Sequence, residues 1–471
     1  MKKNLLTSYI AGIFDTEHGE SYGKIIRLFT PEFVIAFLIY FLPLWIDAYF
    51  IGCLKSTATY GALGMTNNLL HFIMKIAEGI SVGTVILSGF FNGKQEYANV
   101  GRSLRDAFWI SIVTGASFAL FLYLGAAWIY GWYVPADMVA QGVPFLRMRA
   151  IGIFFMFVSY AFLGFLRGIK NTRVPMQIYI AGVVSFILVD YMLIFGMYGC
   201  PQMGLTGSAI ASIVQNIVMA VAAMMYVLLN PEYRVYGINL MSGITQHDQL
   251  VRLLALSWPV VIDKATLAAA YIWLGTMLKD LGTNTAATFI VVKDMERLAF
   301  LPAIAFAQVI TFLVSNDYGR HNWEGIKSNI KKVAFLASSM VFILIAVLVL
   351  DPERIIRLFD QRGEFTPMAA TVFPVMSVLL FFDLVQLILA GALRGASNVR
   401  MVMMVRLIIC SGFFVPVSYL FSKMPMENVA LKFMCIYGSY YVGNLLMSLI
   451  YIQRLSCDDW KKKAAQYEDN R

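Results

Sequence analysis

The sequence has 471 residues, of which 59% are hydrophobic and only 14% are charged, whereas soluble domains carry about 25% charged residues. A globular core cannot hold so much apolar surface, so the composition excludes a soluble protein and predicts one that faces lipid. The net charge of +9 does not indicate nucleic-acid binding, because the basic residues lie between apolar runs and form no single patch.

Apolar runs of helical length follow one another along the whole chain. Each comes close to the roughly 20 residues that cross a bilayer as a helix, and strand-type alternation does not accompany them. The pattern predicts an all-α integral membrane protein with twelve transmembrane helices. Read with their Gly and Pro punctuation, the predicted spans are residues 28–51, 62–88, 107–130, 143–166, 174–197, 205–229, 251–278, 286–313, 332–350, 368–393, 399–421 and 431–453.

Lys and Arg are distributed unequally between the two sets of connections. The connections that follow the even-numbered spans are richer in Lys and Arg than the others. Because basic loops stay on the cytoplasmic side, we expect a multi-pass protein of the cell membrane with both termini in the cytoplasm.

The chain repeats its own pattern about 226 residues later, which is typical of transporters built from two halves. Leu166-Arg167-Gly168 recurs as Leu393-Arg394-Gly395, Pro31 recurs as Pro259, and Gly93 recurs as Gly319. Duplicated bundles also occur as channels and scaffolds, which remain alternatives. The repeat predicts two parallel six-helix lobes, residues 1–229 and 251–454, joined by a cytoplasmic linker at 230–250 and followed by a tail at 455–471.

No motif indicates catalysis. The sequence contains no phosphate-binding loop, no zinc-binding motif and no arrangement of nucleophile and base. We therefore expect no enzyme activity, no metal site and no cofactor, with energy supplied by an ion gradient or by the gradient of the substrate itself. An integral-membrane enzyme is the alternative from another functional class.

Seven stretches along both halves carry a family resemblance: Leu44–Gly52, Gly61–Gly64, Gly79–Gly83, Leu166–Gly168, Leu188–Gly196, Gly204–Ala211 and Asp383–Gln386. They resemble the corresponding stretches of the multidrug and toxic compound extrusion (MATE) transporters. The resemblance implies two six-helix lobes around a V-shaped cavity and alternating access. It also implies that a single chain exports amphipathic organic molecules in exchange for protons or sodium. The wider superfamily contains lipid-linked oligosaccharide flippases, which are the alternative.

Acidic residues inside apolar runs are the main candidates for ion coupling. An ionisable group at bilayer depth is costly, so each one suggests a function. Asp47 and Asp190 lie at a similar depth, roughly 24–28 Å from the cytoplasmic edge, and are expected to share one site. The resemblance implies ion coupling at both and at Asp383. The family often has Asn where this chain has Phe186, which favours protons over sodium at this site.

The second half carries a different set of charges. Asp263, Lys264 and Asp383 fall at one depth, so we expect Lys264 to neutralise Asp383 and form a gate. In span eight, Asp294 with Arg297 and Lys293 with Glu296 are spaced three residues apart, so that each can pair within one helix, and so are Lys75 and Glu78 in span two of the first half. These charges either neutralise one another or form a polar cavity wall for a charged or zwitterionic substrate.

Five further polar residues are candidates for lining the substrate cavity. The alternative is that they only connect helices through hydrogen bonds, which is common in membrane proteins. They are Tyr40, Ser208, Gln215, Asn216 and Gln386.

Overall fold

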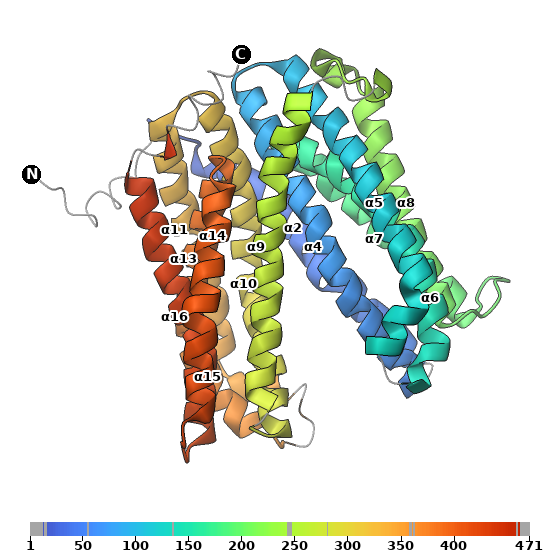
Figure 1. Cartoon of the computed structure of the whole chain (residues 1–471), viewed down its shortest axis with the longest axis vertical. Helices are drawn as coiled ribbons and strands as arrows, with labels where there is room; N and C mark the ends of the chain where they lie inside the picture. Colours follow the sequence, from blue (N-terminus) through green and yellow to red (C-terminus); the bar gives the residue numbers. More distant parts are fainter. Residues whose placement is uncertain are drawn as a thin grey trace, which may run out of the picture. The chain divides into compact units, whose positions relative to one another are not determined.

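The computed structural model describes residues 13, 17–53, 56–133, 136–242, 247–279, 281–357, 360, 363–457 and 460–461. Its regular structure is helical throughout these residues, and twelve helical segments are long and apolar enough to cross a membrane, which confirms the predicted fold class. Figure 1 shows the helices coloured along the chain from blue to red. The twelve segments are Tyr22–Gly52, Thr59–Gly93, Tyr97–Trp132, Met138–Gly168, Arg173–Phe195, Leu205–Leu229, Gln249–Lys279, Asn284–Gly319, Trp323–Leu350, Thr366–Gly395, Val399–Lys423 and Val429–Ser456.

The chain forms two compact units. The N unit is Thr30–Val261, and the C unit consists of the described residues up to Phe29 together with those from Ile262 onward. Both boundaries fall inside a helix, within two residues of Pro31 and Pro259. The first helix of each half, α2 (Tyr22–Tyr40) or α9 (His247–Lys279), therefore contributes residues to both units.

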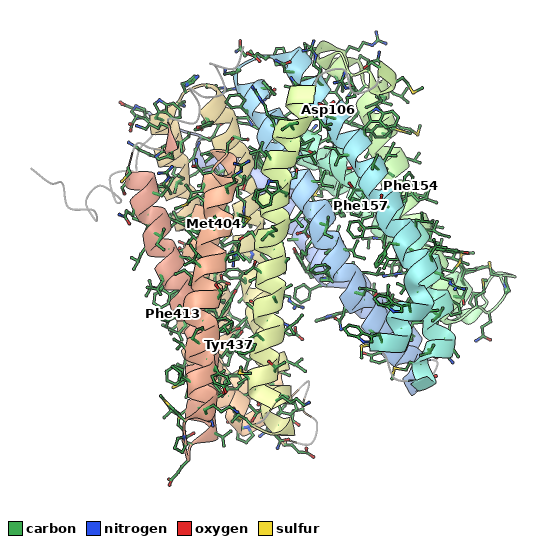
Figure 2. All side chains as sticks on the ribbon, in the orientation of Figure 1. Asp106, Phe154, Phe157, Met404, Phe413 and Tyr437 are labelled. Carbon is green, nitrogen blue, oxygen red and sulfur yellow. The ribbon has the colours of Figure 1, made fainter. Side chains whose placement is uncertain are left out.

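The N unit contains the rest of α2 and the six helices that follow it. These helices are α3 (Leu42–Gly52), α4 (Thr57–Gly93), α5 (Tyr97–Tyr133), α6 (Ala136–Gly168), α7 (Arg173–Phe195) and α8 (Leu205–Leu229). Helix α6 is central because it packs against α4, α5 and α8. Phe157 of α6, labelled in Figure 2, stacks on Phe118 of α5 with ring centroids 5.9 Å apart.

The C unit is built on α10 and α13 in the same way. Its helices after α9 are α10 (Thr283–Gly319), α11 (Trp323–Leu350), α12 (Pro352–Ile356), α13 (Thr366–Gly395), α14 (Val399–Ile409), α15 (Val415–Lys423) and α16 (Val429–Ser456). A π-helical turn, η3 (Cys410–Phe414), joins α14 to α15. Helix α13 packs against α10 and α16.

Glycines at matching positions let the central helices approach closely in both units. A Cβ atom on Gly168 of α6 would lie 2.8 Å from Ser88 Cβ on α4. A Cβ atom on Gly395 of α13 would lie 2.4 Å from the carbonyl oxygen of Thr311 on α10. The glycine of the Leu-Arg-Gly motif recurs in both halves because only glycine fits where these helix backbones meet.

Helix ends also match between the halves. Gln95 follows α4 with φ 63° and His321 follows α10 with φ 56°, while Lys170 follows α6 with φ 62° and Ser397 follows α13 with φ 59°. Residues other than glycine seldom adopt this left-handed conformation. Its recurrence at matching places shows that the sequence repeat is a structural repeat.

The described part of the predicted linker, residues 230–242 and 247–250, belongs to the N unit. It forms two short 3-10 helices, η1 (Pro231–Tyr236) and η2 (Leu240–Ser242). Asn171 Nδ2 donates a 2.8 Å hydrogen bond to the Tyr233 hydroxyl, and Trp109 Nε1 donates a 3.0 Å bond to the Leu240 carbonyl. Asp106, labelled in Figure 2 on the same end of α5, pairs with Arg105 at 2.9 Å.

His18 and Glu20, just before α2, bind to α11 of the C unit through their backbone carbonyls. Lys332 of α11 is 2% exposed, and its ammonium donates hydrogen bonds to the carbonyls of His18 at 2.9 Å and Glu20 at 3.2 Å. Ser328 Oγ donates a 2.7 Å bond to the same His18 carbonyl. A buried lysine thus serves here to satisfy backbone acceptors.

A candidate ion and substrate site in the N unit

Asp47 lies on α3, the short helix that starts at Leu42 after α2 ends at Tyr40. Its carboxyl group is 3% exposed, and Oδ1 accepts a 2.7 Å hydrogen bond from Ser208 Oγ of α8. Ser208, predicted as a cavity residue, therefore positions the carboxylate of Asp47. The buried hydroxyl fixes the direction of this carboxylate because a buried acceptor needs a donor.

Asp190 lies on α7 and is completely buried, with 0% exposure. Neither of its carboxylate oxygens has a hydrogen-bond partner among the residues that the structure describes. It interacts electrostatically with both Asp47 and Arg149. The two acids that the sequence placed at one depth are therefore close enough to influence each other's charge.

Arg149 of α6 is a third member of this cluster, and the sequence analysis did not identify it. Its guanidinium interacts electrostatically with Asp47 and Asp190. Two neutral side chains hold it: Nη2 donates a 3.0 Å hydrogen bond to Asn67 Oδ1 of α4, and Nη1 donates to Ser212 Oγ of α8. Over the described part of the chain, no direct ion pair joins the guanidinium to either carboxylate.

A cavity of about 170 Å³ opens beside this cluster, entirely within the N unit. Two of the predicted cavity residues line it, Gln215 and Asn216 of α8, and Asn216 Nδ2 donates a 2.8 Å hydrogen bond to the Ser212 carbonyl. The lining residues are Leu38, Ile39, Asp47, Asn67, Leu70, His71, Met74, Arg149, Ile153, Met156, Tyr160, Tyr179, Phe186, Ser212, Gln215, Asn216 and Met219.

The remaining two predicted cavity residues have other surroundings. Tyr40 of α2 accepts a 3.2 Å hydrogen bond from the Lys75 ammonium, which also forms the predicted pair with Glu78 at 2.9 Å. Gln386 is buried in the C unit on α13, with 1% exposure. Neither residue is among those that line this cavity.

In the C unit, the contacts that the structure describes for Asp383 do not include the predicted pairing with Lys264, which interacts electrostatically with Asp263. Asp383 accepts a 3.0 Å hydrogen bond from Asn444 Nδ2 of α16. Asp263 is 1% exposed and forms buried ion pairs with two arginines, with Arg394 Nη2 at 2.6 Å and with Arg406 Nε. The arginines come from α13 and α14, so their proximity to Asp263 depends on how the helices pack.

The charged residues of α10 have two kinds of partner: an opposite charge on α10 itself, or aromatic side chains of other helices. Asp294 and Arg297 form the predicted pair at 3.4 Å. The predicted pair of Lys293 and Glu296 is wrong over the described residues, because Glu296 Oε2 accepts a hydrogen bond from the Tyr437 hydroxyl.

The side chains around Glu296 and Lys293 explain this outcome. Tyr437, labelled in Figure 2, lies on α16, and Tyr441 donates a 3.2 Å hydrogen bond to it. The Lys293 ammonium lies 5.3 Å from the ring centroid of Tyr271. Aromatic partners from other helices thus replace the pairing within α10.

The sequence could have narrowed the counter-charge of the N-unit cluster to two arginines, Arg147 and Arg149, but not to one of them. Arg147 and Arg149 both lie inside the predicted span 143–166 and are two residues apart, which rotates them by about 200° around a helix. They must face opposite sides, so one of them points into the unit. The structure shows Arg147 exposed beside the Tyr123 ring and Arg149 at the cavity.

The MatE family model matches this chain twice, over residues 33–192 and again over residues 259–420. Together the two ranges cover more than half of the chain. They correspond to the two halves of the repeat, which supports the internal duplication seen in the sequence and in the helix ends.

Curated relatives resemble most of the chain at low identity. A probable multidrug resistance protein NorM of Thermotoga maritima is 23% identical over 383 residues, which are 80% of this chain and 81% of the relative. The probable multidrug resistance protein YoeA of Bacillus subtilis is 23% identical over 84% of each chain.

Solved structures share the fold. A MATE crystal structure in the bent conformation has a TM-score of 0.83 and 17% identity, and the match covers 94% of this chain and 96% of that one. An outward-facing multidrug resistance MATE family transporter has a TM-score of 0.82 at 17% identity, with 93% and 96% covered. From the family match and this shared fold, we conclude that the chain belongs to the multidrug and toxic compound extrusion family of membrane transporters.

Proposed function

We propose that this chain is a secondary active antiporter that exports amphipathic organic molecules in exchange for protons by alternating access. The names of its relatives as multidrug resistance proteins support the substrate class. The bias of Lys and Arg supports a place in the cell membrane with both termini in the cytoplasm. Both halves of the repeat lie in one chain, which supports function as a monomer.

The observation that carries the proposal is the buried carboxyl group of Asp190. Neither of its oxygens has a hydrogen-bond partner among the described residues. A charge that is buried without a direct partner is unfavourable by several kcal/mol. Proton uptake removes that charge, so this group can bind and release a proton as its surroundings change.

The composition of the cluster supports protons as the coupling ion. Asp47 and Asp190 carry two negative charges and Arg149 carries one positive charge, so a single proton makes the cluster neutral. Arg149 already supplies positive charge where a sodium ion would need to bind. Phe186 lies one turn before Asp190, lines the cavity and offers no oxygen ligand.

Exchange follows if the substrate and the proton compete for the same carboxylates. Asp47 lines the cavity beside Asp190, so a cationic group of a substrate would be attracted to the charges that a proton neutralises. By linkage, each ligand then weakens the binding of the other. Substrate binding from one side would release a proton, and protonation from the other side would release the substrate.

The test is export of a fluorescent amphipathic dye with a cationic group from proteoliposomes under a proton gradient or a sodium gradient, imposed separately. We expect the proton gradient alone to drive export, and Asp190→Asn to reduce the rate at least about tenfold, equivalent to 1.4 kcal/mol. Asp47→Asn should do the same. Asp294→Asn, on an exposed pair of α10, is the matched control and should leave the rate unchanged.

Two results would contradict the proposal in different ways. Export driven equally well by sodium would refute the choice of coupling ion. An undiminished proton-driven rate in Asp190→Asn would show that this carboxyl group is not part of the coupling.

A further inference from the structure

The cavity of the N unit presents both signs of charge. Arg149 reaches it from α6 and Asp47 reaches it from α3. A purely cationic molecule would meet the guanidinium there, and a purely anionic one would meet the Asp47 carboxylate. A molecule with both charges can satisfy both sides.

The guanidinium is fixed in place by neutral groups. Asn67 and Ser212 accept from its two terminal nitrogens and hold it between α4 and α8. A guanidinium has five N–H groups in a planar fork that matches a carboxylate. Because neither Asp47 nor Asp190 forms a direct ion pair with it within the described part of the chain, a carboxylate from outside can approach it.

The cavity is small, and apolar side chains form much of its remaining lining beside polar ones such as His71, Gln215 and Asn216. Leu70, Met74, Ile153, Met156 and Met219 surround the polar groups. An apolar cavity of about 150 Å³ binds one benzene ring, and this cavity measures about 170 Å³. The flexible methionines can adjust to different ring shapes.

We propose that Arg149 is a specificity-determining residue that binds the carboxylate of the substrate, and that the cavity selects small aromatic zwitterions whose ammonium group lies at Asp47. The inference rests on the proposed function, because it takes this cavity as the substrate site. It agrees with proton exchange, since the ammonium group competes with the proton for Asp47 while the carboxylate stays at Arg149.

The test compares two probes that differ only in the carboxylate. Radiolabelled 4-(aminomethyl)benzoate is a zwitterion, and 4-(aminomethyl)benzamide is a cation of the same shape. Their affinities for the purified full-length protein in nanodiscs are measured by equilibrium dialysis, with empty nanodiscs as the blank. We expect the zwitterion to bind about tenfold more tightly, as one charge-assisted hydrogen-bonded pair allows.

Variants assign that preference to a residue. Arg149→Gln should bind both probes equally, and Arg149→Lys should keep only part of the preference because it loses the planar fork. Arg147→Gln removes the exposed arginine on the opposite face of α6 and should keep the full preference. If Arg149→Gln does not give a monodisperse protein, Arg149→Lys decides.

Three results would overturn the inference: equal affinities of the wild type for the two probes, no measurable binding of the zwitterion at millimolar concentration, or an unchanged preference in the Arg149 variants. A failure of the proposed function would give a different experimental result. It would leave the binding preference in place while neither probe moved under a proton gradient.

Discussion

The buried ion pairs of Asp263 allow a sharp prediction about stability. The substitution Asp263→Asn keeps the volume of the side chain and removes its charge. Asp263, Arg394 and Arg406 are 1%, 7% and 2% exposed, so the two arginines would remain in the interior without the carboxylate between them. Removing one partner from a buried ion pair typically costs about 3–5 kcal/mol.

The structure supplies two comparisons for this magnitude. Glu32 is 2% exposed, and within the described part of the chain its ion pair is with Arg167, at 2.9 Å. Glu32→Gln therefore leaves one unpaired cation where Asp263→Asn leaves two. Asp294→Asn removes an exposed pair, which is worth about 0–1 kcal/mol. We expect the loss of stability to be largest for Asp263→Asn, smaller for Glu32→Gln and close to zero for Asp294→Asn.

The assay is thermal unfolding of the purified protein followed by tryptophan fluorescence. At about 2–4 °C per kcal/mol for a unit of this size, Asp263→Asn should lower the melting temperature by about 6 °C or more. Adding Arg406→Gln removes one of the stranded cations and should recover part of the loss. Equal melting temperatures for Asp263→Asn and Asp294→Asn would refute the reasoning, as would a double variant no more stable than Asp263→Asn alone.

Two further substitutions test the helix packing and a loop. Gly395→Ala places a Cβ atom 2.4 Å from the Thr311 carbonyl oxygen and should cost about 1–3 kcal/mol. A Cβ atom on Gly412 would have no neighbour within 4 Å, so Gly412→Ala should change the melting temperature little. An equal loss of stability in both variants would contradict the close helix contact at Gly395. Outside the membrane, burial opposes ionisation of Asp360, but hydrogen bonds from the Thr366 hydroxyl and from the amides of residues 364–366 lower its pKa from 3.8 to about 2. Because its pKa is lower in the folded protein than in the unfolded chain, ionised Asp360 stabilises the fold at pH values above the unfolded pKa. This stabilisation is lost as the pH falls through the folded pKa. The melting temperature of the wild type should exceed that of Asp360→Asn at neutral pH, and the difference should shrink between pH 3.8 and about 2; a difference independent of pH would show that the charge of Asp360 does not matter.

Helix rise was sufficient to place Asp47 and Asp190 at a common depth, and the packing of α3 against α7 brings them close enough to interact. It was not sufficient for their counter-charge. Arg149 stood in a predicted span beside Arg147, and only the rotation of α6 decides which of the two faces the cavity.

The C unit shows the same limit. The predicted spans correctly included Asp263, Lys264 and Asp383. Residues at the same depth on different helices need not be in contact, however, so depth did not predict their partners. Arg394 and Arg406 reach Asp263, and Asn444 reaches Asp383, from segments more than sixty positions away in the chain.

The sequence by itself determined the number of spans, the duplication and the family resemblance. These depend on the length of apolar runs and on local motifs such as Leu166-Arg167-Gly168, where a bilayer and a close helix contact act on neighbouring residues. Only the tertiary structure decided the partner of each buried charge, as Asp263 with its two arginines and Glu296 with Tyr437 show. The physical reason is that a buried charge must find its counterpart across helix interfaces, and the packing and rotation of distant helices, which no local pattern encodes, determine what lies there.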